Sequence, residues 1–598
     1  MIVPMRKVYL VARRAGRDRL LEALRDLGLV HLQAVDSARA VADDETLSAI
    51  DRCRRALQIL RNTSPAGGPL DLSPSAAADE VLRIQRESVE RANRLSNLHH
   101  QLQQLALWGD VRLEQFEALR AAGIEPRFFA VPRDTVHEIR AECVHPLGPW
   151  PNKRTLVAVI NRAGEVEAPE GSEAIPLPSR DRPSIRAEAA EIDAALKADA
   201  AKLACLVRHD GAMEAELAKL RDRAAWTIAT RSSLDGEHLY ALRGWVPADQ
   251  ADRLAADLAA QGALAAVEAL EPEPGDEPPT LIQYPWWARP MEGLFKILGT
   301  VPGYAEFDVS AMFMIFLPVF SAILISDAGY GLVYLILPLV FYRKLASAGA
   351  APLAQLIIAI GVMSLAWGIV TCSFFGFNIS PLLGREGPFI AVDMQKESMD
   401  LLMAISLTLG AIHLSLAHLW KAMAAFPRLT FLCEAGWAGV LWGMYGVAKM
   451  FLVGSPASWD EFFHNTPYPY LGGAGIALAI LFAAPDRNPL KMIGLGLVNF
   501  PLSFIGTFGD TVSYVRLMAI GLAGSVLAVT FNDMGRSLPW MLMVPVLLVG
   551  HGLNVALSIV SLLAHGVRLN MLEFSNNLGM TWCGYSYEPF SKTRGEEN

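Results

Sequence analysis

The chain has 598 residues, 52% hydrophobic and 19% charged, with a formal net charge of −9. Residues 1–300 hold 38 Lys and Arg and 44 Asp and Glu, about 27% of that half, whereas residues 301–598 hold 14 and 17, about 10%. This division excludes a single soluble globule, a disordered chain and a nucleic-acid-binding protein. The six scattered cysteines, none in CxxC spacing, indicate neither a zinc site nor a disulfide framework, so we expect no bound metal or cofactor.

The charged half, residues 1–300, predicts small α/β lobes joined by polar helices. Alternating strands and short amphipathic helices predict three lobes, at residues 6–34, 125–180 and 238–270, the second with a strand at 155–160. Residues 40–62 and 75–108 have the polar periodicity of helices. A proline-rich linker at 271–279 follows the last lobe.

Two leucine-rich seams indicate a helical arm. The first seam contains Leu95, Leu98, Leu102 and Leu105, and the second contains Ile192, Leu196, Asp199, Leu203, Leu206, Asp210, Met213, Leu217 and Leu220. Both have the alternating spacing of coiled coils, and we expect Asp199 and Asp210 to interrupt the second. Two seams around a lobe predict an antiparallel arm of roughly 45–65 Å. A generic coiled-coil spacer is the alternative to a tethering arm.

The apolar half, residues 301–598, predicts about eight membrane spans. Two lie close together within 310–343, and the others are at 352–375, 399–420, 432–453, 470–485, 497–531 and 540–575. The last two exceed the bilayer thickness, so they must tilt strongly or kink. The N-terminal apolar run is too short for a signal peptide.

The distribution of cations predicts the orientation of the spans. With both ends cytoplasmic, the inner segments carry Arg343, Lys344, Lys421, Arg428, Arg487, Lys491, Lys592 and Arg594. The outer segments and helix ends carry Arg385, Lys396, Lys449 and Arg536. The excess of inner cations supports eight spans with both termini inside.

Arg516 and Arg568 are charges within apolar spans, where burial is expensive and function is the default hypothesis. Arginine stays protonated at any physiological pH, so each must face a cavity, an acid, or a partner that brings an acid. Two polar stripes accompany these arginines. The last span carries His551, Asn554, Ser558, Ser561, His565 and Arg568, and the preceding span carries Asn499, Ser503, Thr507, Asp510 and Tyr514, all at helical spacing.

Together the two stripes predict a water-lined ion path. Hydrogen bonds between helices and arginines reaching toward a helix end are the plainer interpretations. Asp327 lies in a glycine-rich turn and is expected to be structural, and His413 and His418 are expected to pack in the core rather than bind metal. No phosphate-binding loop is present in the sequence, so we expect no ATP hydrolysis by this chain alone.

Several segments resemble subunit I of the V/A-type rotary ATPases, whose eukaryotic equivalent is the V-ATPase a subunit. They are FIGTFGDTVSYVRLMAIGLAGSVLA, GHGLNVALSIVSLLAHGVRLNMLEFSNNLG, YSYEPF, ISDAGYGLVYLI, SFFGFNISPLLG and the N-terminal MRKVYLVARRAGRDRLLEALRDLGLVHLQ. The resemblance covers essentially the whole chain. It implies a mainly α fold, with N-terminal cytoplasmic α/β lobes on a long antiparallel coiled-coil arm (1–300). An eight-helix transmembrane domain with two long tilted C-terminal helices (301–598) follows.

By resemblance the chain is a stator that conducts H⁺ or Na⁺ through two half-channels against a ring of c-type proteolipid subunits. Arg516 and Arg568 match the two arginines that separate the half-channels. Asp510, His551, His565 and Glu573 become candidate relay residues, although Glu573 lies off the 551–568 stripe of a regular helix. Asn554, Ser558, Ser561 and Tyr514 complete the candidate path.

The resemblance also implies partners and a location. The arm is expected to bind peripheral stalk (E/G-type) subunits, and the central stalk and catalytic A/B subunits only indirectly. The lipid bilayer is a further partner, and nucleic acid is not. A prokaryotic inner membrane is the expected location. A stand-alone secondary transporter with a cytoplasmic regulatory domain, and a membrane-anchored scaffold, are the alternatives. The coupling ion and the direction of ATP turnover stay open.

Overall fold

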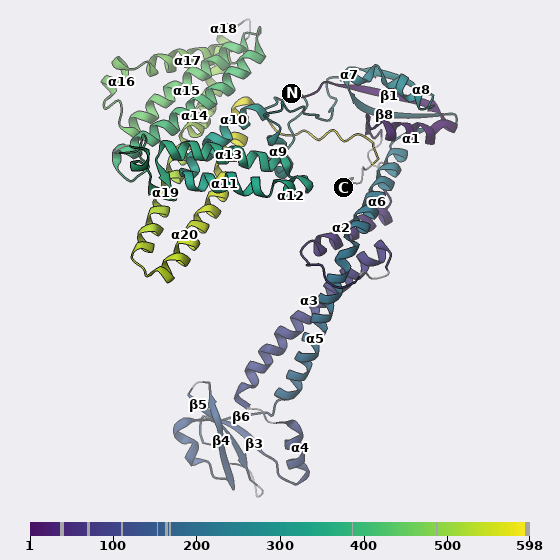
Figure 1. The fold of residues 1–598 in the computed structure, drawn as a ribbon, viewed down its shortest axis with the longest axis vertical. Coiled ribbons are helices and arrows are strands. Elements are labelled where there is room, and N and C mark those ends of the chain that lie inside the picture. The colour runs from purple at the N-terminus through teal and green to yellow at the C-terminus, as the bar shows by residue number, and fades with distance from the viewer. Residues whose placement is uncertain are drawn as a thin grey trace. The chain divides into compact units, whose positions relative to one another are not determined.

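The computed structural model describes residues 1–35, 41–68, 72–108, 112–151, 153–161, 166, 169–384, 387–485 and 488–592 (Figure 1). The chain forms two compact units. The first contains residues 1–8, 245–253 and 268–589, and the second contains residues 9–244, 254–267 and 590–598. Three cations of the predicted orientation pattern, Arg385, Arg487 and Arg594, lie outside the described residues.

The strand–helix–strand segments at the two ends of the charged half join in one five-stranded sheet. Its order is β2 (His31–Gln33), β8 (Leu239–Pro247), β1 (Met5–Arg13) and β9 (Ala266–Leu270), and β7 (Leu234–Asp235) pairs with β8. Helix α1 (Arg17–Leu27) ends at Gly28, whose φ of 61° is the left-handed conformation that glycine adopts without strain. Two short helices, α7 (Ala248–Ala251) and α8 (Leu254–Ala260), lie between β8 and β9.

The predicted lobe at 125–180 forms a separate antiparallel sheet. Its strand order is β4 (Cys143–Trp150), β5 (Arg154–Ile160), β3 (Arg127–Pro132) and β6 (Glu173–Ile175). The strand predicted at 155–160 is confirmed within β5. Helix α4 (Leu113–Ala121) precedes the sheet, and Trp108 and Phe116 pack edge-on against Phe128 of β3.

Between the lobes run four helices: α2 (Asp44–Leu60), α3 (Pro74–Gln104), α5 (Arg182–Leu206) and α6 (Asp210–Arg231). Helices α3 and α5 lie side by side and are joined through the lobe at their far end (Figure 1). Leu57, Val81, Ile84, Leu206 and Met213 form their buried core near α2. The two seams therefore lie on neighbouring helices, and the coiled-coil geometry of the arm stays a prediction.

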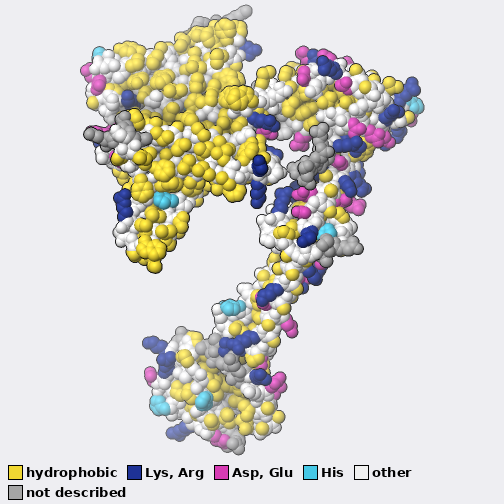
Figure 2. Space-filling model, viewed as in Figure 1, with side chains coloured by type: hydrophobic (Ala, Val, Ile, Leu, Met, Phe, Trp, Pro, Cys, Tyr) yellow, Lys and Arg dark blue, Asp and Glu magenta, His cyan; other side chains and the backbone are white. Residues whose placement is uncertain are grey.

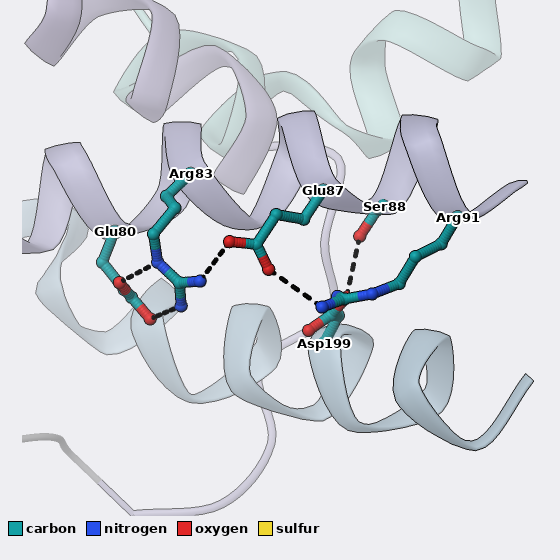
Figure 3. Close-up of polar contacts among 6 residues, drawn as sticks. All are labelled: Glu80, Arg83, Glu87, Ser88, Arg91 and Asp199. Carbon is teal, nitrogen blue, oxygen red and sulfur yellow. Dashed lines mark hydrogen bonds and ion pairs between the residues drawn. The ribbon is translucent and has the colours of Figure 1, made fainter. Parts of the chain in front are cut away.

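Asp199 lies between α3 and α5 and is paired with a cation from the facing helix. Asp199 is 7% exposed, and its carboxylate accepts a hydrogen bond from Arg91 of α3 (Figure 3). Arg91 also lies 3.0 Å from Glu87, which pairs in turn with Arg83. Because a buried carboxylate needs such a partner, the expected interruption of the seam is an ion-pair contact between helices. Asp210 is exposed at the start of α6, where the helix dipole favours a carboxylate.

The same face of α3 carries further ion pairs. Glu80 accepts two hydrogen bonds from Arg83, which lower the pKa of its carboxyl group (Figure 3). On α5, Oε1 of Glu188 lies 2.7 Å from Nη2 of Arg94, and Oε2 lies 2.5 Å from Nη2 of Arg180. These contacts lower the pKa of the Glu188 carboxyl group.

The apolar half forms a helical unit whose long members could cross a membrane. Five stretches are long and apolar enough: Ala351–Val370 (α13), Lys396–Ala425 (α14), Thr430–Val453 (α15), Leu490–Arg536 and Trp540–Leu578. Three shorter apolar helices are α10 (Ser310–Ile325), α11 (Ala328–Val340) and α17 (Tyr468–Phe482). Each lies at a predicted span, while the count of eight crossings stays a prediction. Figure 2 shows hydrophobic side chains over most of the visible face of this unit.

The two long C-terminal helices differ from their predicted bounds. The first begins at Pro489, not near residue 497, and divides at Tyr514 into α18 (Pro489–Ser513) and α19 (Val515–Arg536). The second begins as α20 (Trp540–Ser561) and continues through two wide-turn segments, Leu562–Gly566 and Leu569–Phe574, to α21 (Ser575–Leu578). The helical assignment of the first is thus interrupted at Tyr514, and the second changes its helical pitch, while the expected strong tilt or kink stays a prediction.

Glycines allow the apolar helices to approach closely. A Cβ atom on Gly439 of α15 would lie 2.9 Å from the Leu471 carbonyl oxygen of α17, and one on Gly475 would lie 2.5 Å from the Gly436 oxygen. Apolar solvent supplies little force between helices, so small residues that permit backbone contact stabilise such pairs.

The Asp199 contact predicts a measurable change in the arm. In Asp199→Ala, Arg91 loses its partner on α5, which should cost about 1–3 kcal/mol. Amide hydrogen exchange in α3 and α5 of the full-length chain should become several-fold faster. Asp193→Ala on the same helix is the matched control, because Asp193 is half exposed and its ion pair is with Lys197, four residues on in the same helix. Equal exchange in both variants would contradict the assigned role of Asp199.

Candidate functional site

Three charged side chains meet where α19 begins and the last helix changes pitch. The carboxylate atom Oε1 of Glu573 lies 3.4 Å from Nε of Arg568 and 3.9 Å from Nη1 of Arg516. The Glu573 side chain is 4% exposed, whereas those of Arg516 and Arg568 are 25% and 52% exposed. A carboxylate so deeply buried among membrane helices requires positive charge beside it. We call Arg516, Arg568 and Glu573 the charge cluster.

The wide turns of the last helix explain why Glu573 joins this cluster. In a regular α-helix, side chains three or four residues apart share a face, so Glu573, five residues after Arg568, falls off the stripe. Leu569–Phe574 is instead a segment with i→i+5 hydrogen bonding, whose turn is wider by about one residue. That pitch aligns positions five apart. Arg568 and Glu573 therefore contact each other although they are five residues apart, and the role of Glu573 in an ion path stays a prediction.

A first polar network leaves the charge cluster through Asn577 of α21. The Asn577 Nδ2 group donates to Oδ2 of Asp510 at 2.8 Å and to the carbonyl oxygen of Glu573 at 2.6 Å. On the other side, Oδ1 of Asn577 lies 3.1 Å from Nε2 of His418. The two acceptors on Nδ2 fix the orientation of the amide, so its oxygen faces the histidine.

The network continues from His418 to the ends of α14 and α15. Nδ1 of His418 lies 2.9 Å from Oε2 of Glu434, and Oε1 of Glu434 lies 2.9 Å from Nζ of Lys421. Both ring nitrogens of His418 thus face acceptors, an arrangement that a proton-carrying imidazolium satisfies. Asp510, Asn577, His418, Glu434 and Lys421 form the first network, in which four of five side chains can carry charge.

A second polar network joins α11, α19 and α20. The Tyr330 hydroxyl is 2.8 Å from Nδ1 of His551 and accepts from Nδ2 of Asn554 at 3.0 Å. Nε2 of His551 lies 3.2 Å from Oδ1 of Asn532, whose Nδ2 donates to the Phe375 carbonyl oxygen at 2.7 Å. Tyr330, His551, Asn554 and Asn532 form the second network.

The charge cluster stands between the two networks along both long helices. On the α18–α19 stretch the order is Asp510, Arg516, Asn532, and on the last helix it is Asn554, Arg568, Asn577. A polar route along either helix therefore meets two arginines at its middle. This arrangement suits a path that opens from two sides and is closed to direct passage by fixed positive charge.

The remaining residues predicted for the path lie outside the charge cluster and the two networks. Ser558 is buried and donates to the Asn554 carbonyl oxygen at 2.8 Å, which is the helix-internal bond expected of a structural serine. Ser561 and His565 are half-buried, and neither has a hydrogen bond within the described residues. Tyr514 is buried, with its hydroxyl 2.8 Å from Nδ1 of His413. On α18, Asn499 and Ser503 are exposed and Thr507 is buried.

Sequence reasoning left five residues of the two networks out of the candidate path: His418, which was expected only to pack in the core, Glu434, Asn577, Tyr330 and Asn532. His413 and His418 lie on one helix, and both are buried as expected: His413 stacks on Phe574 with ring centroids 4.5 Å apart, and His418 stacks on Trp437. The sequence held one signal for the first network: Asn577 lies four residues after Glu573, a spacing that places both on the same helix face.

Asp327 has the structural role expected of it. Its carboxylate caps α11 through the backbone of Gly329 and Tyr330 and also accepts from Ser373, Phe375 and Gly376. Among the described residues, no three His, Cys, Asp or Glu side chains are placed to hold a metal ion.

Comparisons with known proteins identify full-length relatives. No protein-family model matches the chain. V-type ATP synthase subunit I of Borreliella burgdorferi is 28% identical, with 99% of this chain and 100% of that protein covered. V-type ATP synthase subunit I 1 of Treponema pallidum has the same identity and coverage. A-type ATP synthase subunit I of Methanocaldococcus jannaschii is 26% identical over 60% of this chain and 56% of its own.

These relatives confirm the resemblance to V/A-type subunit I that the sequence motifs predicted. Among solved structures, the cytoplasmic N-terminal domain of subunit I, a homologue of V-ATPase subunit a, is 15% identical. It covers 44% of this chain and 99% of its own, with a TM-score of 0.19, too low to support a statement about the fold.

The second network predicts a stability effect at Asn532. In Asn532→Leu, Nε2 of His551 and the Phe375 carbonyl oxygen both lose their partner, which should cost about 1 kcal/mol for each of these half-buried groups. The purified full-length chain should unfold in detergent at a lower temperature than the parent. Asp533→Ala is the control, since that side chain is 64% exposed on the next position of the helix. A midpoint for Asn532→Leu equal to that of the control would contradict the network.

Proposed function

We propose that this chain, a homologue of V-type and A-type ATP synthase subunit I, is the stator that conducts H⁺ or Na⁺ past a rotating ring of c-type proteolipid subunits. The observation that carries the proposal is the charge cluster, in which two arginines share one buried carboxylate between two separate polar networks. In this proposal the networks are the two half-channels, and they open to opposite sides of the membrane.

The charge cluster supplies the barrier between the half-channels. A cation or proton arriving from either network meets the fixed charges of Arg516 and Arg568, which repel it. A ring carboxylate that comes opposite these arginines is stabilised in its ionised form and releases its proton. Arg568 suits this encounter because about half of its side chain is exposed in the isolated chain.

Lipid enforces the coupling to rotation. An ionised ring carboxylate costs several kcal/mol to move into hydrocarbon, so it must be neutralised from the second half-channel before it passes into the bilayer. Each ion that crosses the membrane therefore accompanies one step of the ring. The arginines contribute to this coupling through their position and positive charge alone, and they need not exchange protons themselves.

Within the first network, His418 and Asp510 are the proposed proton carriers. Glu434 and Lys421, near the predicted cytoplasmic ends of α14 and α15, form the entrance. The amide of Asn577 does not carry protons, so it acts as a positioning residue that holds His418 and Asp510 on its two sides. The proton crosses between them through water. In the second network, His551 is the titratable group, and His565 stands beside the two arginines as a further candidate.

The charged half is proposed to hold the stator still. Residues 1–300 form the cytoplasmic arm that binds the peripheral stalk (E/G-type) subunits, and residues 301–598 form the translocating domain. The ion pairs that link α3 to α5, including Arg94 with Glu188, suit a helix pair that resists torque. In this proposal the chain has no nucleotide-hydrolysing site and meets the catalytic A/B subunits and central stalk only indirectly. Both termini lie in the cytoplasm of a prokaryotic cell.

Arg516 tests the barrier. Arg516→Ala should abolish ATP-driven ion pumping by the complex in inverted membrane vesicles, because the fixed charge at the start of α19 is lost. The amount of assembled complex should stay unchanged, because Glu573 keeps the nearer cation, Arg568, at 3.4 Å. Arg536→Ala is the matched control on α19, since Arg536 is 68% exposed and pairs with neighbouring Asp533. Coupled pumping by the Arg516→Ala complex would refute the proposal.

Asn577 tests the first half-channel. Asn577→Leu removes the amide that holds Asp510 and His418, so pumping should slow by about tenfold and its pH dependence should change. Asn576→Leu, at the exposed neighbouring position, should pump like the parent. If both variants have the parent's rate at every pH from 5 to 9, the first network does not carry the ion.

A further inference from the structure

An apolar groove lies where helices α10, α14 and α15 meet, outside the charge cluster and both networks. Its volume is about 590 Å³, and every residue that lines it is apolar, among them Met312, Leu419, Trp420, Met423, Phe426 and Phe431. Met423 is 71% exposed and Phe426 is 67% exposed, so the groove is open on one side. Because its walls are membrane helices, this opening faces the bilayer region rather than the protein core.

A cation stands at the end of the groove. Helix α14 ends at Ala425 and α15 begins at Thr430, and Arg428 lies in the short connection between the lining residues Phe426 and Phe431. Arg428 is exposed and has no acidic partner within the described residues. Its position on the predicted cytoplasmic side is where anionic lipid headgroups concentrate.

The combination of an open apolar groove and an unpaired arginine at its polar end matches one kind of molecule. We propose that the groove binds an acyl chain of an anionic glycerophospholipid from the surrounding bilayer, with the lipid phosphate held by Arg428. A guanidinium group binds phosphate oxygens through two parallel hydrogen bonds. A neutral apolar helix in the groove would leave the hydrogen-bond donors of Arg428 without such a partner. Trp420, at the wall of the groove, has the amphipathic ring that favours the headgroup level.

The bound lipid would lie beside the first polar network. Trp420 and Ala435 line the groove, and their next neighbours in sequence, Lys421 and Glu434, form the ion pair that ends the network. The lipid therefore occupies the membrane-facing side of the proposed entrance and excludes loosely bound water from it. Lipid binding itself rests on the groove and Arg428 and does not depend on the proposed ion path.

The test measures lipid retained by the full complex. The complex is purified with mixed phosphatidylglycerol and phosphatidylcholine, and bound lipid is counted by native mass spectrometry. The parent should retain phosphatidylglycerol selectively. Arg428→Ala should weaken this retention about fivefold, the effect of one cation near an anionic headgroup. Ala435→Phe, which fills the groove, should remove the lipid. Arg343→Ala, another exposed cation on the predicted cytoplasmic side, is the control and should retain it.

A photo-crosslinking residue at Met423 identifies what occupies the groove in the assembled complex. Crosslinking to phospholipid supports the proposal. Crosslinking to another subunit would overturn it, as would unchanged phosphatidylglycerol retention in Arg428→Ala or equal retention of phosphatidylcholine by the parent. Should Ala435→Phe fail to assemble, Arg428→Ala and the Met423 crosslink still decide the outcome.

Discussion

A buried carboxylate between membrane helices must be matched by positive charge, and this constraint organises the whole apolar half. Glu573 is almost fully buried, and its partners come from two different helices, Arg568 on its own and Arg516 at the start of α19. The pairing joins the start of α19, just after the break at Tyr514, to the wide-turn segment that contains Glu573. Both irregularities interrupt regular α-helical hydrogen bonding, and both occur where Arg516, Arg568 and Glu573 meet.

The polar groups on either side of this cluster differ in kind. The first network contains two carboxylates, an ammonium group and a histidine, so its members can exchange protons and hold opposite charges. The second consists of a histidine with tyrosine and asparagine side chains, satisfied by hydrogen bonds rather than by ion pairs. The two proposed half-channels are therefore expected to bind their ion by different chemistry, one by charge and the other by hydrogen bonding.

Local periodicity predicted much of the site, and its failures have physical reasons. The stripe from His551 to Ser561 follows the α-helical spacing of α20, whereas the contact of Glu573 with Arg568 was not predictable because the pitch widens from Leu562 onward. The link from Asn577 to His418 joins residues 159 positions apart, which no local pattern contains. Asp199 was expected to interrupt a seam because its partner, Arg91, lies on a helix more than a hundred residues earlier. The mainly helical architecture and the α/β lobes followed from patterning alone.

The central claim is that the charge cluster works against the carboxylate of a neighbouring ring. Leu572 is 47% exposed and adjoins Glu573, so it offers a position for disulfide crosslinking. In a complex without native cysteines, Leu572→Cys should form a disulfide with a cysteine placed next to the proteolipid carboxylate. That bond should stop ATP-driven pumping until it is reduced. No crosslink to any ring position, in a complex that pumps normally, would contradict the account.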